Sequence, residues 1–218
     1  MIVLNRSSRN RALNQLMSAI PSKREAILKA ARTIFVRSGY RGASMEAIAE
    51  EAPVSKPTLY SHFGSKHELF IAVIQTQCAS LVGSLDRANT LGLPAETGIR
   101  AIAESFVQTI FNPESLALYR LIIAEHHHCP ELAQLMDQTV IQPNLDLLSA
   151  YLRSLNDSNS LTIPDPSASG QLLLGMLKGI PHFRCLTGLS QGLSAEEAQR
   201  LIDFAVHQFL RGHGLAHS

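Results

Sequence analysis

Apolar residues recur at helical spacing along most of the chain, and the sequence contains no alternating strand pattern of useful length. The first predicted helix begins at Ser22, which forms an S-x-x-E capping box with Glu25, and ends at Gly39. Its inner side consists of Ile27, Ala30, Ala31, Ile34 and Phe35. A second, short helix is predicted from Ser44 to Pro53, whose ring cannot continue a helix.

A third short helix is predicted within VSKPTLYSHFGSK, residues 54–66, and it buries little. Ser55 caps this helix, and Pro57 is tolerated in the first turn because that turn has no intrahelical partner for the missing N–H. At about 100° per residue, Leu59 and Phe63 share one face. The other side carries Pro57, Thr58, Tyr60 and Ser61. A helix with two apolar anchors and a polar outer side indicates a partner on that side.

The remaining pattern is also helical. A second capping box, Ser65 with Glu68, predicts a long fourth helix that continues through Val82. Further helices are predicted at residues 95–111, 113–127, 131–153 with a break at Pro143, 167–188 and 195–211. A third capping box, Ser194 with Glu197, opens the last of these, and residues 156–166 form a predicted loop.

Charge is divided unevenly along the 218 residues. Residues 1–66 hold 11 Lys and Arg against 4 Glu, a balance of +7, whereas residues 67–218 hold 8 basic and 14 acidic residues, a balance of −6. This division favours a module that binds a polyanion, joined to a body that does not. The alternative is a solvated surface that is basic by chance.

Three scattered cysteines, an odd number, argue against a disulfide framework and predict small buried residues in a reducing environment. The N-terminal apolar run is too short for a secretory signal, and no stretch of about 18 uncharged apolar residues exists. We therefore expect a cytoplasmic protein without a membrane partner.

Three short helices, with a tight turn between the second and third, are typical of a helix-turn-helix domain, in which the third helix enters the major groove of DNA. The chain resembles the DNA-binding domain of TetR-family transcriptional regulators over residues 22–70. The residues that carry the resemblance are Gly39-Tyr40, SMEAIA at 44–49, VSKPTLY at 54–60 and HFGSK at 62–66.

The resemblance implies that one set of side chains lies at or near base edges: Lys56, Pro57, Thr58, Ser61 and His62. Lysine can donate to guanine, and the proline ring and threonine methyl can touch a thymine methyl. Tyr60, Lys66 and the cap residue Ser44 are expected at phosphates. The alternatives are a solvated charge for Lys56, a core position for Tyr60 and a structural role for His62.

One position departs from the family pattern. Pro53 stands where the family commonly has glycine, and proline cannot adopt a positive φ without strain. Either the turn has a negative φ here or the second helix ends earlier.

The family resemblance implies an all-α fold with two domains: a helix-turn-helix domain at residues 21–68 and a C-terminal ligand-binding and dimerisation domain at 69–218. Residues 1–20, with Arg6, Arg9 and Arg11, form a basic N-terminal extension. The last two helices are expected to pair in a homodimer through Leu173, Met176, Leu177, Leu201, Phe204 and Phe209. Helices that face only their own core would show the same apolar stripes.

By the same resemblance, a small-molecule pocket is expected, with candidate lining residues Phe106, Ile110, Tyr119, Ile123, His127 and Met136. Residues at such spacing are also typical of plain core. The run His126 to Cys129 suggests zinc, but adjacent helical residues point about 100° apart and three cannot converge on one ion. We therefore expect no metal or cofactor.

The expected function is a repressor that binds a palindromic double-stranded DNA operator as a homodimer and is released by an unidentified effector. Two alternatives from other classes stay open. One is a helical adaptor that binds protein through the third helix. The other is a metal-dependent enzyme that uses His126, His127, His128 and Cys129, although no nucleophile motif, phosphate loop or metal-spaced signature supports catalysis.

Overall fold

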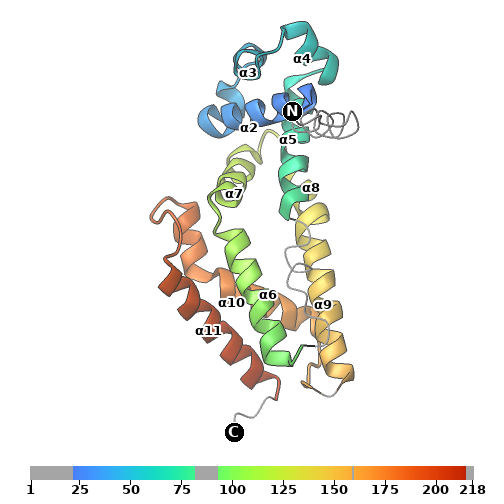
Figure 1. Ribbon diagram of the computed structural model, residues 1–218, viewed down its shortest axis with the longest axis vertical. Helices are drawn as coiled ribbons and strands as arrows, with labels where there is room; N and C mark the ends of the chain where they lie inside the picture. Colours follow the sequence, from blue (N-terminus) through green and yellow to red (C-terminus); the bar gives the residue numbers. More distant parts are fainter. Residues whose placement is uncertain (1–21, 82–92, 159, 215–218) are drawn as a thin grey trace, which may run out of the picture. The chain divides into compact units, whose positions relative to one another are not determined.

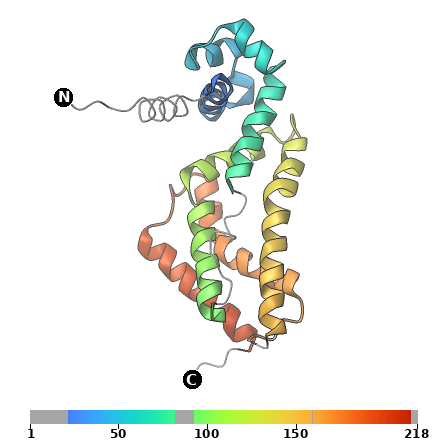
Figure 2. The same cartoon turned by 45° about the vertical axis from the view of Figure 1, so that its right-hand side comes forward.

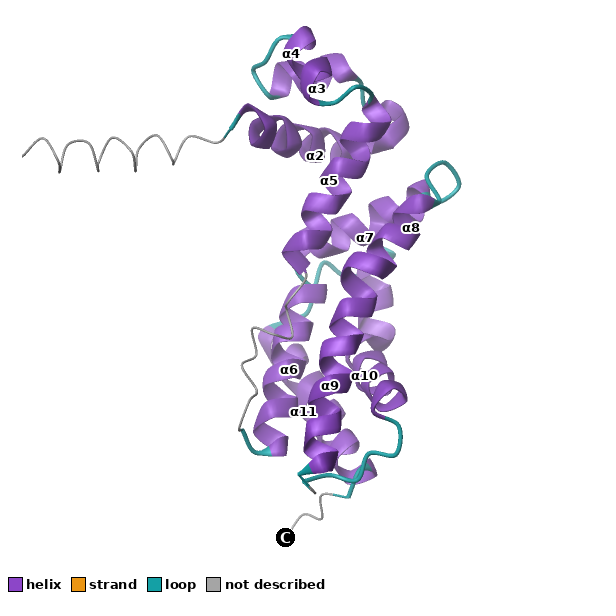
Figure 3. Cartoon of the chain, turned by 90° about the vertical axis from the view of Figure 1, so that its right-hand side faces the viewer, coloured by secondary structure: helices purple, strands orange, loops and turns teal. Residues whose placement is uncertain are grey.

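A computed structural model of the chain describes residues 22–81, 93–158 and 160–214, and every regular element in these residues is helical (Figure 3). The elements are α2 (Lys23–Gly42), α3 (Met45–Glu51), α4 (Lys56–His62), α5 (Lys66–Leu81), α6 (Ala95–Ile110), α7 (Pro113–Glu125), α8 (Glu131–Met136), the π-helical turn η2 (Asp137–Ile141), α9 (Gln142–Asp157), α10 (Pro166–Leu186) and α11 (Ala195–Gly212). The all-α prediction is confirmed. The predicted basic extension and Val82 lie outside the described residues.

The chain forms two compact units, which meet in sequence between Val73 and Ile74. In the first, α3 packs against α2 and α4 packs against α3. Its core contains an aromatic cluster, in which the rings of Phe35 and Phe70 meet edge to face with centroids 4.8 Å apart and the ring centroid of Tyr40 lies 4.8 Å from that of Phe70. This core supports the two short helices.

Side-chain caps define the first unit's helices as predicted. Ser22 and Glu25 form a complete capping box on α2, and Ser44 accepts a hydrogen bond from the Ala47 N–H on α3. The second predicted capping box differs in detail, because the Glu68 carboxylate accepts from the Gly64 N–H. Gly39 marks a kink within α2, with φ of 67°, where the pattern predicted an end.

In the second unit, α10 packs against α6, α7, α9 and α11 (Figures 1 and 2). Its buried core includes Ile99, Ile102, Leu148, Leu152, Leu173, Leu177 and Phe209. Gly170 permits the close approach of α10 to α9, because a Cβ there would lie 3.2 Å from Leu148 Cδ2. All three cysteines are buried and form no disulfide, as predicted.

The predicted helix over 131–153 is broken into α8, the turn η2 and α9, with Pro143 in the first turn of α9. Proline has no N–H for an i→i−4 bond and its ring clashes with the preceding turn, so the backbone widens locally. The Asn144 side-chain amide donates to the Val140 carbonyl at 2.7 Å beside this irregular turn.

The predicted helix over 167–188 contains a kink that the apolar pattern did not reveal. Gly179 has φ of 42°, and Pro181 follows two residues later. Glycine suits the end of a helical segment and proline suits the first turn of the next. Lys178 therefore ends the first segment of α10.

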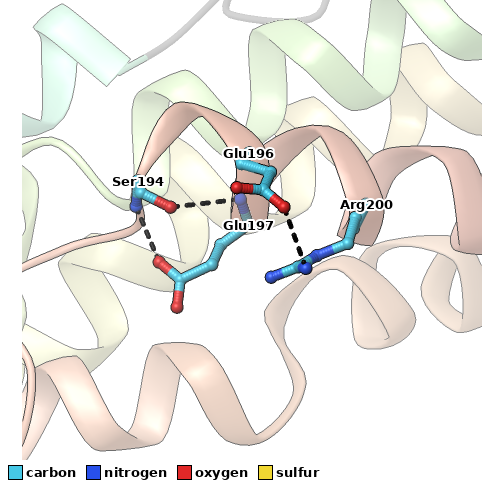
Figure 4. A network of polar contacts seen from close by, with 4 residues as sticks. All are labelled: Ser194, Glu196, Glu197 and Arg200. Atoms are coloured by element: carbon cyan, nitrogen blue, oxygen red, sulfur yellow. Dashed lines mark hydrogen bonds and ion pairs between the residues drawn. The ribbon is translucent and has the colours of Figure 1, made fainter.

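The start of α11 confirms the third predicted capping box (Figure 4). The Glu197 N–H donates to Ser194 Oγ at 3.2 Å, and the Ser194 N–H donates to the Glu197 carboxylate at 2.8 Å. Glu196 and Arg200 form an exposed ion pair one turn apart. No helix among the described residues combines the length and the apolar character needed to cross a membrane.

Candidate nucleic-acid interface and ligand cavity

Helix α4 has the two-sided character that its sequence predicted. Leu59 and Phe63 are buried, and Tyr60, with 47% of its area exposed, lies on the open side. Exposed neighbours on this side are Lys56, Pro57, Ser61 and His62, and Thr58 is half-buried. Pro57 lies in the first turn, and Ser55 caps the helix by accepting from the Thr58 N–H. Two buried side chains, Leu59 and Phe63, therefore hold the helix on the first unit while its polar side stays exposed.

The serine and threonine hydroxyls of α4 and its N-cap already have local partners. The hydroxyls of Ser55 and Thr58 lie 2.8 Å apart, and Ser61 donates to the Thr58 carbonyl at 2.8 Å. Ser61 Oγ consequently retains its acceptor capacity, which suits the amino groups of adenine or cytosine in the major groove.

Lys56 on α4 pairs with Glu46 on α3 at 3.0 Å, and both side chains are more than half exposed. The hydrogen bond from Lys56 lowers the pKa of Glu46, with the lysine charge as a further cause. Such an exposed ion pair contributes little to stability, so Lys56 is able to exchange Glu46 for an acceptor on DNA. The sequence reasoning did not identify this partner.

Within the first unit, Lys66 donates to two backbone carbonyls. Its Nζ donates to the Tyr40 carbonyl at 2.9 Å and to the Ala43 carbonyl at 3.1 Å. An ammonium group has three donors, so one remains for a phosphate. The sequence pattern predicted the charge at the start of α5 but not its attachment to the turn between α2 and α3.

Of the two alternatives for Pro53, the structure contradicts a negative φ, because the φ of Pro53 is 22°; α3 ends at Glu51. The Val54 N–H donates to the Ala49 carbonyl at 3.0 Å, which is the 6→1 hydrogen bond of a Schellman motif at the C-terminus of α3. The second hydrogen bond of this motif, the 5→2 bond, requires an N–H at position 53, which proline lacks. Pro53 therefore occupies a glycine conformation without the hydrogen bond that glycine would supply.

A cavity of about 230 Å³ lies within the second unit, between α6, α7, η2, α9 and α10. Three of the predicted lining residues, Phe106, Ile110 and Tyr119, are part of its wall. The other three are placed elsewhere: Ile123 and His127 are exposed, and Met136 is buried outside the lining. Lining residues that the sequence reasoning missed include Thr109, Asn144, Gly175 and Lys178.

Lys178 brings a charge to this cavity. Its Nζ lies 5.7 Å from the ring centroid of Tyr119 and 6.0 Å from that of Phe106. Burial lowers the pKa of Lys178 and raises the pKa of Tyr119. The described part of the chain gives the ammonium ring contacts but no carboxylate partner.

His182 is buried behind Tyr119, whose ring meets the imidazole edge to face with centroids 5.3 Å apart. Burial first, and the charge of Lys178 second, lower the pKa of His182 from 6.5 to about 4, against a backbone hydrogen bond with Ile110. Its Nε2 has no hydrogen-bond partner among the described residues. The imidazole is therefore neutral at neutral pH.

The residues predicted for a subunit interface separate into two groups. Leu173, Leu177 and Phe209 are buried in the chain's own core and cannot reach a partner, which corrects the prediction for these three. Phe204 is 62% exposed, and Met176 and Leu201 are half-buried. Other exposed apolar residues on α10 are Leu172, Ile180 and Phe183.

The histidine run follows the end of α7. His126, His127 and His128 are exposed, whereas Cys129 is buried. The His126 ring nitrogen Nδ1 donates to the Ile123 carbonyl, 2.7 Å away, as expected for a side chain at a helix end. The thiol and the imidazoles therefore do not share one environment.

Two family models match the chain. Residues 27–73 match the model described as bacterial regulatory proteins, tetR family. Residues 97–214, more than half of the chain, match the model described as AefR-like transcriptional repressor, C-terminal domain.

Among curated relatives, the chain is 41% identical over 88 residues to the HTH-type transcriptional activator FasR of Mycolicibacterium smegmatis, which covers 40% of each protein. It is 46% identical over 57 residues to the HTH-type transcriptional regulator RutR of Escherichia coli K12, or 26% of this chain and 27% of that protein. The matched part thus spans less than half the length of these relatives.

Solved structures match over nearly the whole chain. A protein described as a TetR-family transcriptional regulator from Mesorhizobium loti has a TM-score of 0.80 at 28% identity and covers 97% of this chain and 100% of its own. The flavonoid-responsive regulator FrrA has a TM-score of 0.69 at 28% identity, over 89% and 98% of the two chains.

Proposed function

Because the chain belongs to the TetR family of DNA-binding transcriptional regulators, we propose that it represses transcription by binding a palindromic operator as a homodimer and is released by a small-molecule effector. The single observation that carries the DNA-binding part is the open polar side of α4 above its two buried anchors, Leu59 and Phe63. A short helix of this kind fits the major groove, where base edges differ in donors and acceptors.

The proposed contacts divide by chemistry. Base edges are the proposed partners of Lys56, Pro57, Thr58, Ser61 and His62. Phosphates are the proposed partners of Tyr60, Lys66 and Ser44, which carry a phenol, an ammonium and a helix-capping hydroxyl. Phosphate contacts fix the register of the protein on DNA, and base contacts read the sequence.

A homodimer is supported by the apolar surface on the last two helices. The exposed apolar residues of that surface are Leu172, Ile180, Phe183 and Phe204. Exposed apolar residues that gather into one patch mark a surface that binds another protein. A two-fold dimer would place two copies of α4 on two half-sites of a palindrome, which supplies specificity that one short helix lacks.

Repression and effector release are supported by the family match and the cavity in the second unit. The model that matches residues 97–214 is described as a transcriptional repressor domain, whereas the activator FasR aligns over only 40% of the chain. FrrA is described as flavonoid-responsive, and the cavity between α6 and α10 offers space for a small molecule. An effector that lowers operator occupancy a hundredfold must prefer the non-binding conformer by about 2.7 kcal/mol.

The test begins with genomic DNA. Fragments retained by the purified protein are sequenced, and affinity for the enriched site is measured against salt concentration. We expect a two-fold symmetric site and a log–log slope of about −0.9 for each phosphate contact. A slope near zero would favour the adaptor alternative, in which small polar groups of α4 bind protein. Absence of any enriched site would contradict the proposal.

A further inference from the structure

The cavity holds one charge that no described residue around it balances. Among the described residues that line it, Lys178 is the only one that carries a formal charge at neutral pH. It is also the only lysine after residue 66. The other polar groups of the wall are neutral hydroxyls and amides, from Thr109, Ser115, Asn144, Gln171 and Tyr119.

The local structure compensates this ammonium only in part. The rings of Phe106 and Tyr119 lie 6.0 and 5.7 Å from Nζ, at the outer limit of a favourable cation–π contact. Lys178 ends the helical segment before Gly179, where the free carbonyls of a helix end favour a positive charge. Neither contact replaces a carboxylate, and Lys178 is half-buried, so its ammonium loses part of its hydration without an opposite charge among the described residues.

Size and wall chemistry limit what can supply the missing charge. The cavity measures about 230 Å³, and an engineered cavity of about 150 Å³ holds benzene. One aromatic ring with several further heavy atoms therefore fits. A single cation matches a single negative charge, and the apolar wall of Ile110, Val140 and Leu174 disfavours a second one.

We propose that the effector of this cavity is an organic monocarboxylate, with an apolar body of one to two rings or similar bulk, whose carboxylate pairs with Lys178 Nζ. This inference rests on the proposed ligand response and adds the chemical class of the ligand. Gly175, an exposed residue of the cavity wall, lies one turn before Lys178, and a Cβ there would have nothing within 4 Å, so the wall leaves space beside the charge.

The test measures binding to the full chain without DNA by calorimetry at neutral pH. The probes are benzoate, 2-naphthoate and octanoate, each paired with its neutral amide. We expect at least one acid to bind about tenfold or more tightly than its amide, because a hydrogen bond to a charged group contributes that much. Lys178→Met should remove this preference and leave the affinity for the amide nearly unchanged.

Two further variants keep the result interpretable. Arg153→Met removes the same charge from an exposed position on α9 and should leave the preference intact. Lys178→Gln replaces Lys178→Met if the latter does not fold, as judged by circular dichroism. Equal affinity for acid and amide, an acid preference that survives both Lys178 variants, or no binding of any acid at millimolar concentration would each overturn the proposal.

A separate arm distinguishes this proposal from the proposed function. Operator binding is measured with and without the acid that binds. Binding through Lys178 without release of DNA would keep the ligand class and contradict effector-controlled repression. Release of DNA by the neutral amides alone would keep that regulation and contradict the ligand class.

Discussion

Lys66 Nζ donates a hydrogen bond to the Tyr40 carbonyl at 2.9 Å and lies 4.5 Å from the centroid of the same tyrosine's ring. A second bond, to the Ala43 carbonyl, fixes the turn that leads into α3. The residue proposed to hold a phosphate therefore also holds the helix-turn-helix together. The hydrogen bonds to Tyr40 and Ala43 fix the position of the Lys66 ammonium, and with it the direction of its third N–H donor.

Lys66→Met is expected to have two separable effects. Loss of two charge-assisted hydrogen bonds should lower the free energy of unfolding by about 1–3 kcal/mol. Loss of the proposed phosphate contact should reduce the salt slope of DNA binding by about 0.9 per contact. Urea unfolding and fluorescence anisotropy at several salt concentrations measure the two effects, with Lys29→Met, an exposed lysine of α2, as the control. An unchanged slope with lowered stability would make Lys66 structural alone.

Pro53→Gly is expected to stabilise the first unit and to leave operator binding largely intact. Glycine adopts the φ of 22° without strain and supplies an N–H for the Glu50 carbonyl. Relief of an unfavourable φ is worth about 1–3 kcal/mol, against about 0.4–1 kcal/mol for the greater freedom of the unfolded chain. Pro53→Ala removes the ring but retains a side chain at positive φ, so its free energy of unfolding should lie between those of the wild type and Pro53→Gly. Complete loss of DNA binding in Pro53→Gly would show that the proline itself orients α4.

The helix-turn-helix was predictable because its determinants are local. Leu59 and Phe63 lie four residues apart, and the caps at Ser22, Ser44 and Ser55 act within three residues. The ion pair between Lys56 and Glu46 was not predictable, because it depends on how α3 and α4 pack.

In the second unit, an apolar stripe identified helices but did not say what each side faces. Leu172 and Leu173 are neighbours of equal hydropathy, yet one is exposed and the other buried in the core. The cavity depends on contacts among α6, α7, η2, α9 and α10. The family resemblance and the apolar spacing therefore pointed to Phe106 but not to Gly175 or Lys178. The kink at Gly179 lies inside a continuous apolar pattern and left no periodic signal.

Phe204→Glu is expected to convert the proposed dimer to a monomer and to weaken operator binding. A carboxylate in place of an exposed ring would be desolvated without a partner in the interface. Sedimentation velocity at several protein concentrations measures the association. Ile123→Glu, on α7 and 56% exposed, is the matched control and should remain dimeric. A dimer that persists in Phe204→Glu would move the interface away from α11.

His182 predicts a loss of stability in mild acid. Its pKa is lowered to about 4 in the folded chain from 6.5. The unfolded chain therefore binds a proton that the folded chain excludes, and the histidine's contribution is complete above 6.5 and declines as pH falls toward 4. The groups that face the imidazole are Lys178, Tyr119 and Phe111. Urea unfolding of His182→Gln should show a weaker pH dependence than wild type across this range. His62→Gln, an exposed histidine of α4, should follow the wild type.

Two glycines of α10, Gly175 and Gly170, differ in the space that their surroundings leave for a side chain. A Cβ at Gly175 would have nothing within 4 Å, whereas a Cβ at Gly170 would lie 3.2 Å from Leu148 Cδ2. Gly175→Ala should raise the free energy of unfolding by about 0.8–1 kcal/mol through helix propensity, and Gly170→Ala should lose that gain to the contact with Leu148. Gly175→Leu should fill part of the cavity, so 2-naphthoate binding falls while the Lys178 charge and DNA binding remain. Calorimetry with 2-naphthoate and urea unfolding test both statements, and undiminished binding in Gly175→Leu would place the ligand outside this cavity.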